Sequence, residues 1–251
     1  MAKTNVLFIL SDDQGPWAAG CYGNSEIRTP NLDRLAATGT MFQDFFVATP
    51  VCSPSRATLL TGRIPSQHGV YDALFVGNIG PDSIPYLDGE VAYTDIMARH
   101  GWTCGLSGKW HLGDSQIPQN GFTDWYVRQT GGGRYYDAPM VRNGQLINEP
   151  GYVTDAITNE GLRMMESYAD RGHPFYLSVH YTAPHNPWIG EHPQAIVDSY
   201  DDCAFETCPQ EPRHPWSDFK DLLDPHHYEA LGNRDALKGY FAAVTAMDQN
   251  I

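Results

Sequence analysis

The sequence predicts an α/β fold with a largely parallel central sheet. Short apolar runs typical of strands alternate along the chain with segments of helical periodicity, which is the pattern of strand–helix–strand units. The chain has 251 residues, of which 41% are hydrophobic and 12% aromatic. That length and composition can bury the core of one large domain or of two small ones.

Four strands are expected, each a short run of apolar and aromatic residues: 5–10, 41–48, 102–108 and 174–181. The first of them, NVLFIL, is apolar almost throughout and lies between polar turns, so we expect a buried, central strand. Residues 183–227 are rich in Pro, His, Asp and Trp and have no clear periodicity. We interpret them as a long irregular insertion near a site.

Five helices are expected, four over 29–39, 53–62, 91–101 and 152–172 and a last one from Asp235. Thr29 is expected as the N-cap of the first, with Pro30 at its first position and Gly39 as its stop. The 152–172 segment is amphipathic, because its apolar residues share one face. The apolar face of the last helix continues to Ile251 without a C-cap.

The net charge of the chain is -14, and its 16 Lys and Arg form no basic block. We therefore expect neither a nucleic-acid partner nor an anionic membrane surface. No apolar run approaches the length of about 18 residues that a membrane span needs, and VLFIL is too short for the core of a signal peptide. The protein is expected in the cytoplasm or, if an export signal was removed, in the periplasm or outside the cell.

Two adjacent carboxylates, Asp12 and Asp13 in SDDQ, follow the first expected strand. Ligands of α/β proteins gather at the carboxyl ends of strands. Adjacent carboxylates are costly unless a cation neutralises them, and calcium and magnesium prefer such oxygen ligands. The pair therefore indicates a divalent cation site, with a solvated acidic turn or a helix cap as the alternative.

The segment CSPSRATLLTGR places Cys52 at the N-terminal end of the second expected helix and Arg56 one turn later. Free backbone N–H groups and the helix dipole favour negative charge there, and the arginine adds a forked cation. A thiolate or a developing oxyanion would be stabilised at this position. The alternative is a buried structural cysteine beside a surface arginine.

Three more polar side chains follow expected strands. SGKWHLG places Lys109 and His111 on the same side of an extended chain, and YTAPHNPW places His185 in a loop stiffened by two prolines. In isolation each could be an ordinary surface lysine or loop histidine. Together with the carboxylates and the helix N-terminus they indicate a cation site next to an anion site, which suits an ester of sulfate or phosphate. No partner can be named for three other histidines: His180, His226 and His227.

These residues resemble the type I sulfatases of the alkaline phosphatase superfamily, whose signature is similar to CSPSRATLLTGR. Five further segments and the first strand match the family in order: NVLFILSDDQ, GCYGN, TPNLDRLAATGTMFQDFF, TGRIPSQHGV, SGKWHLG and APHNPW. The resemblance covers essentially the whole chain. It implies an alkaline-phosphatase-like α/β fold in which helices flank both faces of a largely parallel or mixed sheet.

The resemblance also implies that Cys52 is oxidised after translation to formylglycine by a formylglycine-generating enzyme, which reads Cys52, Pro54 and Arg56. The aldehyde is hydrated; one hydroxyl attacks the sulfur of a sulfate ester, and the second then expels free sulfate. The implied activity is that of a sulfuric ester hydrolase acting on a sulfated small molecule or carbohydrate.

Metal ligation is implied for Asp12, Asp13 and the hydrate derived from Cys52, with calcium as the expected ion and magnesium as the alternative. The family pattern has a further Asp-Asn metal pair and a lysine beyond the helix that begins near Asp235. We therefore expect residues 1–251 to be the N-terminal part of a catalytic domain, cut before the second half of its metal site.

The remaining roles follow from the same resemblance. Arg56 holds the hydrate, and His111 is its hydrogen-bond partner. Lys109 contacts the sulfate, and His185 contacts the sulfate and is the candidate acid toward the leaving oxygen. His68 matches a family position with a structural role.

Two other functions stay open: a phosphonate monoester or phosphodiester hydrolase of the same superfamily, and a non-catalytic relative that binds sulfated glycans. The segment HNPWIGEHPQ could stack on a sugar ring, which favours a carbohydrate sulfate.

Overall fold

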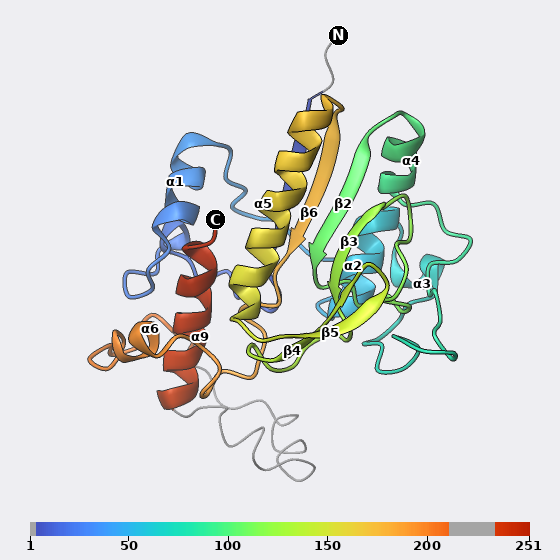
Figure 1. The fold of residues 1–251 in the computed structure, drawn as a ribbon. Helices are drawn as coiled ribbons and strands as arrows, with labels where there is room; N and C mark the ends of the chain where they lie inside the picture. Colours follow the sequence, from blue (N-terminus) through green and yellow to red (C-terminus); the bar gives the residue numbers. More distant parts are fainter. Residues whose placement is uncertain (1–3, 211–233) are drawn as a thin grey trace. The chain divides into compact units, whose positions relative to one another are not determined.

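The computed structural model describes residues 4–210 and 234–251. The chain divides into two units, the first made of Met1–Asp12 and Asp44–Thr182 and the second of Asp13–Gln43 and Ala183–Ile251. The first unit carries the sheet, and the second is helical and irregular (Figure 1). Within the described ranges, no helix combines the length and the apolar character of a membrane span.

The first unit is built on a six-stranded mixed sheet with the strand order β1-β6-β2-β3-β4-β5. Its strands are β1 (Val6–Leu10), β2 (Thr103–Gly108), β3 (Asp124–Arg128), β4 (Ala138–Arg142), β5 (Gln145–Glu149) and β6 (Phe175–His180). The strands β1, β6, β2 and β3 are parallel to one another, whereas β4 pairs antiparallel with both β3 and β5. His180 is level with Leu10 on one side and Gly108 on the other, so three strands end at the same height.

One face of this sheet is covered by α2 (Cys52–Thr61) and α4 (Tyr93–Arg99). Cys104 and Leu106 alternate on β2, and both lie in a buried cluster with residues of α2. Partly buried residues of α4 pack against the same cluster. A short helix, α3 (Pro65–His68), follows α2 in the chain.

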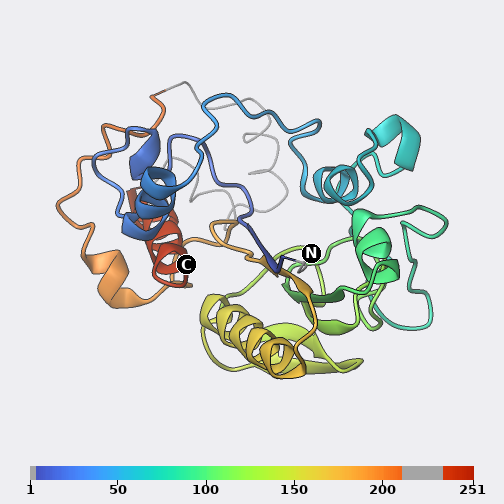
Figure 2. The ribbon, with the colours of Figure 1, turned by 90° about the horizontal axis from the view of Figure 1, so that it is seen from above.

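The opposite face is covered by α5 (Val153–Arg171). On β2, Gly105 and Ser107 alternate with Cys104 and Leu106, so they face α5 instead. The Ser107 hydroxyl donates to the carbonyl of Ile157 in this helix at 2.7 Å. A Cβ on Gly105 would lie 2.2 Å from the Tyr168 hydroxyl, so the strand and helix approach as closely as glycine allows. Helices therefore flank both faces, as predicted (Figures 1 and 2).

The second unit contains η1 (Gly20–Tyr22), α1 (Pro30–Thr38), α6 (Gln194–Asp198) and α9 (Arg234–Asp248). Figure 2 shows α9 beside α1 and α6, on which it packs. The buried carboxylate of Asp248 accepts hydrogen bonds from the backbone N–H groups of Asn31 (3.0 Å) and Leu32 (2.8 Å). A negative charge at this helix N-terminus satisfies two unpaired donors and offsets the dipole of α1.

The expected helices are all present, but two expectations for strands are wrong. Residues 41–48 form no strand, and the side chains of Phe45 and Phe46 are 79% and 85% exposed. β1 exists, but it lies at the edge of the described sheet, where Val6 and Leu7 are exposed, rather than at its buried centre. An apolar run favours a strand, but a strand also needs a partner, and a central position needs one on each side.

The expected insertion is described only as far as residue 210. Residues 183–210 are irregular apart from α6, and residues 211–227 lie outside the described part of the chain.

Candidate functional site

The predicted residues of the first unit converge at the carboxyl ends of its parallel strands. Asp12 follows β1 by two residues, and Lys109 comes directly after β2. Cys52 is the first residue of α2, and Arg56 lies one turn along that helix. The shared height at which the strands end brings residues that are far apart in sequence to one place.

The guanidinium of Arg56 links three of the groups at this place. Its Nη2 donates to Asp12 Oδ2 at 2.8 Å, and its Nη1 donates to the carbonyl oxygen of Lys109 at 2.7 Å. Nη1 also lies 3.2 Å from Nδ1 of His180. Asp12 and Arg56 are each only 4% exposed, so these charged hydrogen bonds lie in a low-dielectric environment where they are strong.

Lys109 is fully buried, and its Nζ lies 2.5 Å from the same Asp12 oxygen. Burial lowers the pKa of Lys109, and the Arg56 guanidinium acts in the same direction, while Asp12 and Cys52 oppose the shift. Two cationic side chains therefore share one carboxylate oxygen. This group can bind an anion, because one negative charge does not neutralise two positive ones.

The imidazole of His111 has one engaged and one open nitrogen. Its Nε2 lies 2.9 Å from the carbonyl oxygen of Leu74, which can only accept, so Nε2 carries the proton. Its Nδ1 is buried and has no hydrogen-bond partner among the described residues. Burial, with Lys109 in the same direction, lowers the pKa of His111 to about 3. The ring is therefore neutral at pH 7 and presents a hydrogen-bond acceptor at Nδ1.

The backbone around His111 is built to hold the ring. His111 has a φ of 58°, a left-handed conformation that is rare for residues other than glycine and that is often retained at functional sites. A Cβ on Gly131 would lie 2.0 Å from Cε1 of His111, so the chain at Gly131 packs directly on the imidazole. Glycine is therefore required there.

Leu74 connects the start of α2 to His111. Its N–H donates to the Ser53 hydroxyl at 3.2 Å, while its carbonyl oxygen accepts from His111. Ser53 is fully buried next to Cys52, which is itself partly exposed. The helix end that carries Cys52 is thus fixed to the loop that orients the imidazole.

In the second unit, His185 lies near Asp13. His185 Nδ1 donates to the carbonyl oxygen of Asn186 at 2.7 Å, and its Nε2 lies 3.7 Å from Asp13 Oδ2. Asp13 also has a left-handed backbone, with a φ of 61°, and its carbonyl oxygen accepts from the Tyr240 hydroxyl at 3.2 Å. The pair thus places an imidazole nitrogen beside a carboxylate.

The donor chemistry of Asp12 and Asp13 fits a hard divalent cation. The two residues are consecutive in the chain, and carboxylate oxygens are the ligands that calcium and magnesium prefer.

The four other histidines named above divide into three groups. His68 is buried, accepts from the N–H of Val70 at 3.2 Å and lies 3.1 Å from the Thr58 hydroxyl, which agrees with its expected structural role. His226 and His227 lie outside the described residues. His180, to which the sequence assigned no role, contacts Arg56 and is the main site residue that sequence reasoning missed.

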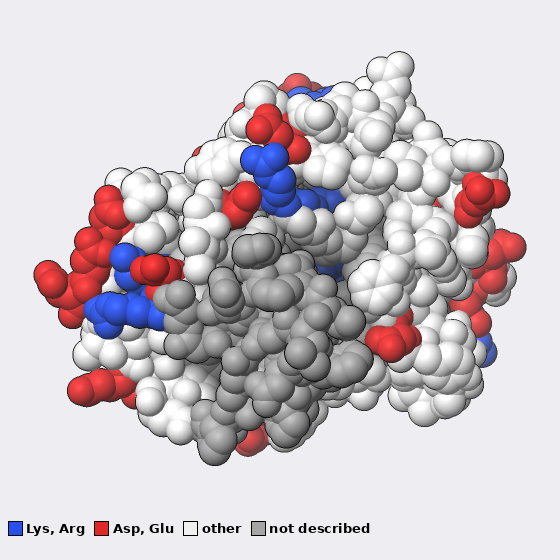
Figure 3. All heavy atoms as spheres, turned by 90° about the horizontal axis from the view of Figure 1, so that it is seen from below, with Lys and Arg blue, Asp and Glu red and all other residues white. Residues whose placement is uncertain are grey.

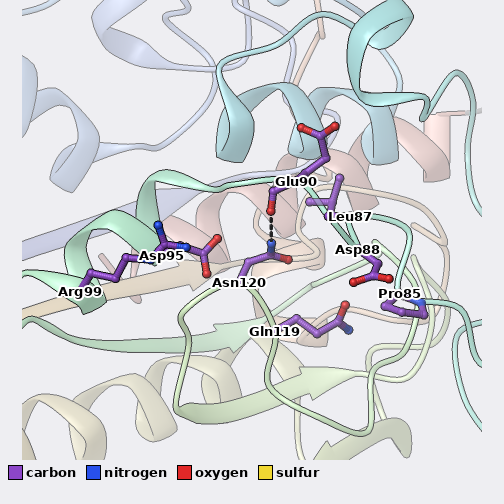
Figure 4. Close-up of a pocket in the computed structure, with 9 residues that line it drawn as sticks. Pro85, Leu87, Asp88, Glu90, Asp95, Arg99, Gln119 and Asn120 are labelled. Atoms are coloured by element: carbon purple, nitrogen blue, oxygen red, sulfur yellow. Dashed lines mark hydrogen bonds between the residues drawn. The ribbon is translucent and has the colours of Figure 1, made fainter.

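A separate pocket of about 250 Å³ lies in the first unit (Figure 4). Asp88, Glu90 and Asp95 are among its lining residues, together with Arg99, and the Asn120 amide donates to the Glu90 carbonyl oxygen at 3.5 Å. None of the predicted site residues lines it. Its acidic lining distinguishes it from the cationic group around Arg56.

Comparison with known proteins gives consistent results. The Sulfatase family model matches residues 4–251. N-acetylglucosamine-6-O-sulfatase of Bacteroides thetaiotaomicron is 33% identical over 189 residues, which cover 74% of this chain and 32% of that protein. Human N-acetylgalactosamine-6-sulfatase is 32% identical over 223 residues, which cover 75% of this chain and 41% of the relative. The chain therefore spans well under half the length of these relatives.

The fold agrees with that of a solved structure, Ps i-CgsB in complex with k-i-k-neocarrahexaose. The TM-score is 0.77 at 26% identity, and the match covers 99% of this chain and 53% of the other. A family match over nearly the whole chain, two named sulfatases as relatives and the shared fold lead to one conclusion. The chain belongs to the sulfatase family.

Proposed function

We propose that the protein hydrolyses sulfuric esters, with the hydrate of a formylglycine derived from Cys52 as the nucleophile. The observation that carries the proposal is the buried group in which Arg56 and Lys109 share the carboxylate of Asp12. The chain as a whole has a net charge of -14, and on the face drawn in Figure 3 the described Lys and Arg side chains lie among Asp and Glu. A buried excess of positive charge in such a protein suits the recognition of an anionic group.

In the first proposed step, one hydroxyl oxygen of the hydrate attacks the sulfur of the ester. A bond forms between this oxygen and sulfur as the hydroxyl releases its proton to solvent. The bond from sulfur to the alcohol oxygen breaks, and the alcohol leaves with a proton supplied by His185. Arg56 and Lys109 stabilise the negative charge of the transferring group. The hydrate itself requires prior oxidation of Cys52 by the formylglycine-generating enzyme with an external oxidant.

In the second step, the remaining hydroxyl loses its proton and its oxygen forms a double bond to carbon. The bond from that carbon to the sulfated oxygen breaks, so sulfate leaves and the aldehyde is regenerated. The open Nδ1 of His111 is the proton acceptor that we assign to this step. The pKa of His111 is lowered first by burial and then by the positive charges of Lys109 and Arg56. An anion bound to these two side chains offsets their charges, so His111 becomes a better proton acceptor.

We further propose that Asp12 and Asp13 hold a divalent cation, calcium or magnesium, with the Cys52-derived hydrate. When bound, the cation supplies positive charge that polarises the hydrate and neutralises the transferring anion.

A sulfated carbohydrate is the substrate class that we propose. Two relatives are named as sulfatases of N-acetylated amino sugars, and Ps i-CgsB binds k-i-k-neocarrahexaose. The partly buried Trp188, in HNPWIGEHPQ, donates from Nε1 to the Pro184 carbonyl oxygen at 2.7 Å, which fixes an aromatic ring three residues after His185. A fixed indole is suited to stacking on a sugar ring.

We also propose that residues 1–251 are the N-terminal part of a larger catalytic domain. The relatives are longer than the matched region. The first unit also has exposed apolar side chains, such as those of Phe45, Phe46 and Phe75. Purified residues 1–251 should then bind calcium weakly and turn over little substrate compared with the full-length protein. Equal turnover by the two forms would refute this proposal.

The Cys52→Ser variant tests the mechanism. A serine hydroxyl can attack sulfur, but it has no second hydroxyl with which to expel sulfate, so the full-length variant should stop after one turnover. Intact mass spectrometry should then detect one stable sulfo group on the peptide that contains residue 52. The Cys21→Ala variant serves as the control and should turn over as the wild type does. Faster hydrolysis by the wild type of a phenyl phosphonate than of sulfate esters would contradict the assigned substrate class.

A further inference from the structure

His180 lies at the end of β6, between the ends of β1 and β2. Its side chain is on the sheet face that α2 covers, since Tyr176, four positions earlier on the same strand, belongs to the cluster shared with α2 and side chains an even number of positions apart share a face. The residue is 3% exposed, and its ring contacts the ring of Phe8 edge-on at 5.8 Å. The imidazole is therefore buried next to the group formed by Asp12, Arg56 and Lys109.

The backbone of His180 holds the chain that leads to Lys109. The N–H of Lys109 donates to the His180 carbonyl oxygen at 2.8 Å. At Gly108 a Cβ would lie 1.9 Å from that oxygen, and the φ of 118° is one that glycine adopts readily. The position of His180 thus determines where Lys109 leaves the sheet.

The side chain of His180 acts at the same place through Nδ1. This nitrogen lies 3.2 Å from Nη1 of Arg56 and 3.2 Å from the carbonyl oxygen of Lys109. The same Nη1 donates to that carbonyl at 2.7 Å. Three polar atoms therefore meet here, and only one of them, the arginine nitrogen, is always a donor.

Nδ1 of His180 has one possible partner in each tautomer. A proton on Nδ1 would donate to the Lys109 carbonyl oxygen, but that oxygen already accepts from Nη1 of Arg56, and two N–H groups only 3.2 Å apart would then converge on one acceptor. With the proton on Nε2, the Nδ1 lone pair accepts from Arg56. Nε2 is buried and has no hydrogen-bond partner among the described residues, so the second tautomer leaves one N–H unpaired, a cost that the hydrogen bond from the charged Arg56 offsets. Burial, with Arg56 in the same direction, lowers the pKa of His180 to about 3, so the ring is neutral.

We propose that His180 is a positioning residue, whose Nδ1 accepts a hydrogen bond from Nη1 of Arg56 and fixes the guanidinium between Asp12 and the Lys109 carbonyl. This deepens the proposed function and rests on it, because Arg56 is one of the two cations assigned to the transferring group. His180 does not touch the reacting atoms. It acts by holding the Arg56 fork in the orientation in which Nη2 bonds Asp12.

Two amide substitutions separate this role from simple packing. In His180→Asn the amide oxygen can take the place of Nδ1, whereas in His180→Gln the amide lies near the former Nε2 position. Gln is closer to His in volume than Asn is, so a packing role would be disturbed less by Gln than by Asn. The positioning role predicts that the first variant keeps kcat/KM within about threefold, whereas the second loses about 10- to 100-fold, the range expected for one hydrogen bond to a charged group.

The measurement uses the full-length protein with Cys52 converted, and thermal midpoints establish that both variants fold. Equal kcat/KM losses in the two folded variants would overturn the proposal. Nitrogen-15 NMR of histidine-labelled wild type provides a readout that needs no activity. It should detect a neutral His180 ring with an unprotonated Nδ1 at pH 7, and a proton on Nδ1 would overturn the proposal. Absence of sulfatase activity in the wild type would instead count against the proposed function, and the NMR result would still decide the geometry.

Discussion

The buried His180 should make the stability of the protein depend on pH, and the size of the effect follows from its environment. The pKa of this imidazole falls from an ordinary value of 6.5 to about 3 in the folded chain. The unfolded chain therefore binds more protons than the folded chain between these values. The contribution of His180 to stability is complete above pH 6.5 and is lost as the pH falls toward 3.

One pKa unit corresponds to about 1.4 kcal/mol, and pH 5 lies about 1.5 units below the ordinary value, so His180 should account for a loss of about 2 kcal/mol between pH 7 and pH 5. The His180→Asn variant removes the titrating group. The decrease in its free energy of unfolding from pH 7 to pH 5 should be smaller than that of the wild type by this amount.

Urea unfolding at the two pH values, followed by circular dichroism, measures this difference. Phe8→Leu is the matched control: it loosens the packing against the same ring but leaves the imidazole in place. It should lower the unfolding free energy by the same amount at both pH values relative to the wild type. If His180→Asn shows the full pH dependence of the wild type, the imidazole is not held neutral by burial and the reasoning fails.

Three more predictions concern the site. Gly131→Ala should reduce kcat by about tenfold or more, because a Cβ 2.0 Å from His111 must displace the ring. Gly151→Ala is the control and should leave kcat unchanged, because a Cβ there meets nothing within 4 Å. Equal kcat in the two variants would show that the contact with Gly131 does not position His111. Arg56→Lys should lower the unfolding free energy by about 2 kcal/mol in urea titrations, because one ammonium cannot replace both arms of the fork, and an unchanged midpoint would contradict the geometry. Asp13→Asn should weaken calcium binding by about tenfold or more in calorimetry, and undiminished affinity would exclude Asp13 as a ligand.

The local parts of the site were predictable from sequence because short-range signals determine them. The periodicity of 53–62, closed by Gly62 in a left-handed conformation, placed Cys52 and Arg56 at the start of a helix. The run before Lys109 placed this residue at the end of a strand. These inferences depend on residues within one turn or one strand of the side chain concerned.

The antiparallel part of the sheet was not predicted, although one signal for it is present. β4 and β5 are joined by Asn143 and Gly144, whose φ values of 51° and 75° are those of a tight hairpin that Asn-Gly favours. The strands themselves are short, and β4 contains Pro139, which argues against a strand when propensity is considered alone.

The role of His180 could not be predicted, because it depends on strand register. Its neighbours in sequence indicate only a buried strand. The contact with Arg56 arises because β6 pairs with β1 and β2 at the same height, which brings together residues separated by 124 positions. A fixed spacing in the sequence does not encode such a contact.

We propose Cys52 as the precursor of the nucleophile. The most direct test is the mass of the peptide that contains residue 52, taken from active full-length protein made in a host with the formylglycine-generating enzyme. The proposed mechanism requires the mass of formylglycine or its hydrate at residue 52, and sulfate release that increases with the converted fraction. An unmodified cysteine thiol in fully active protein would contradict it.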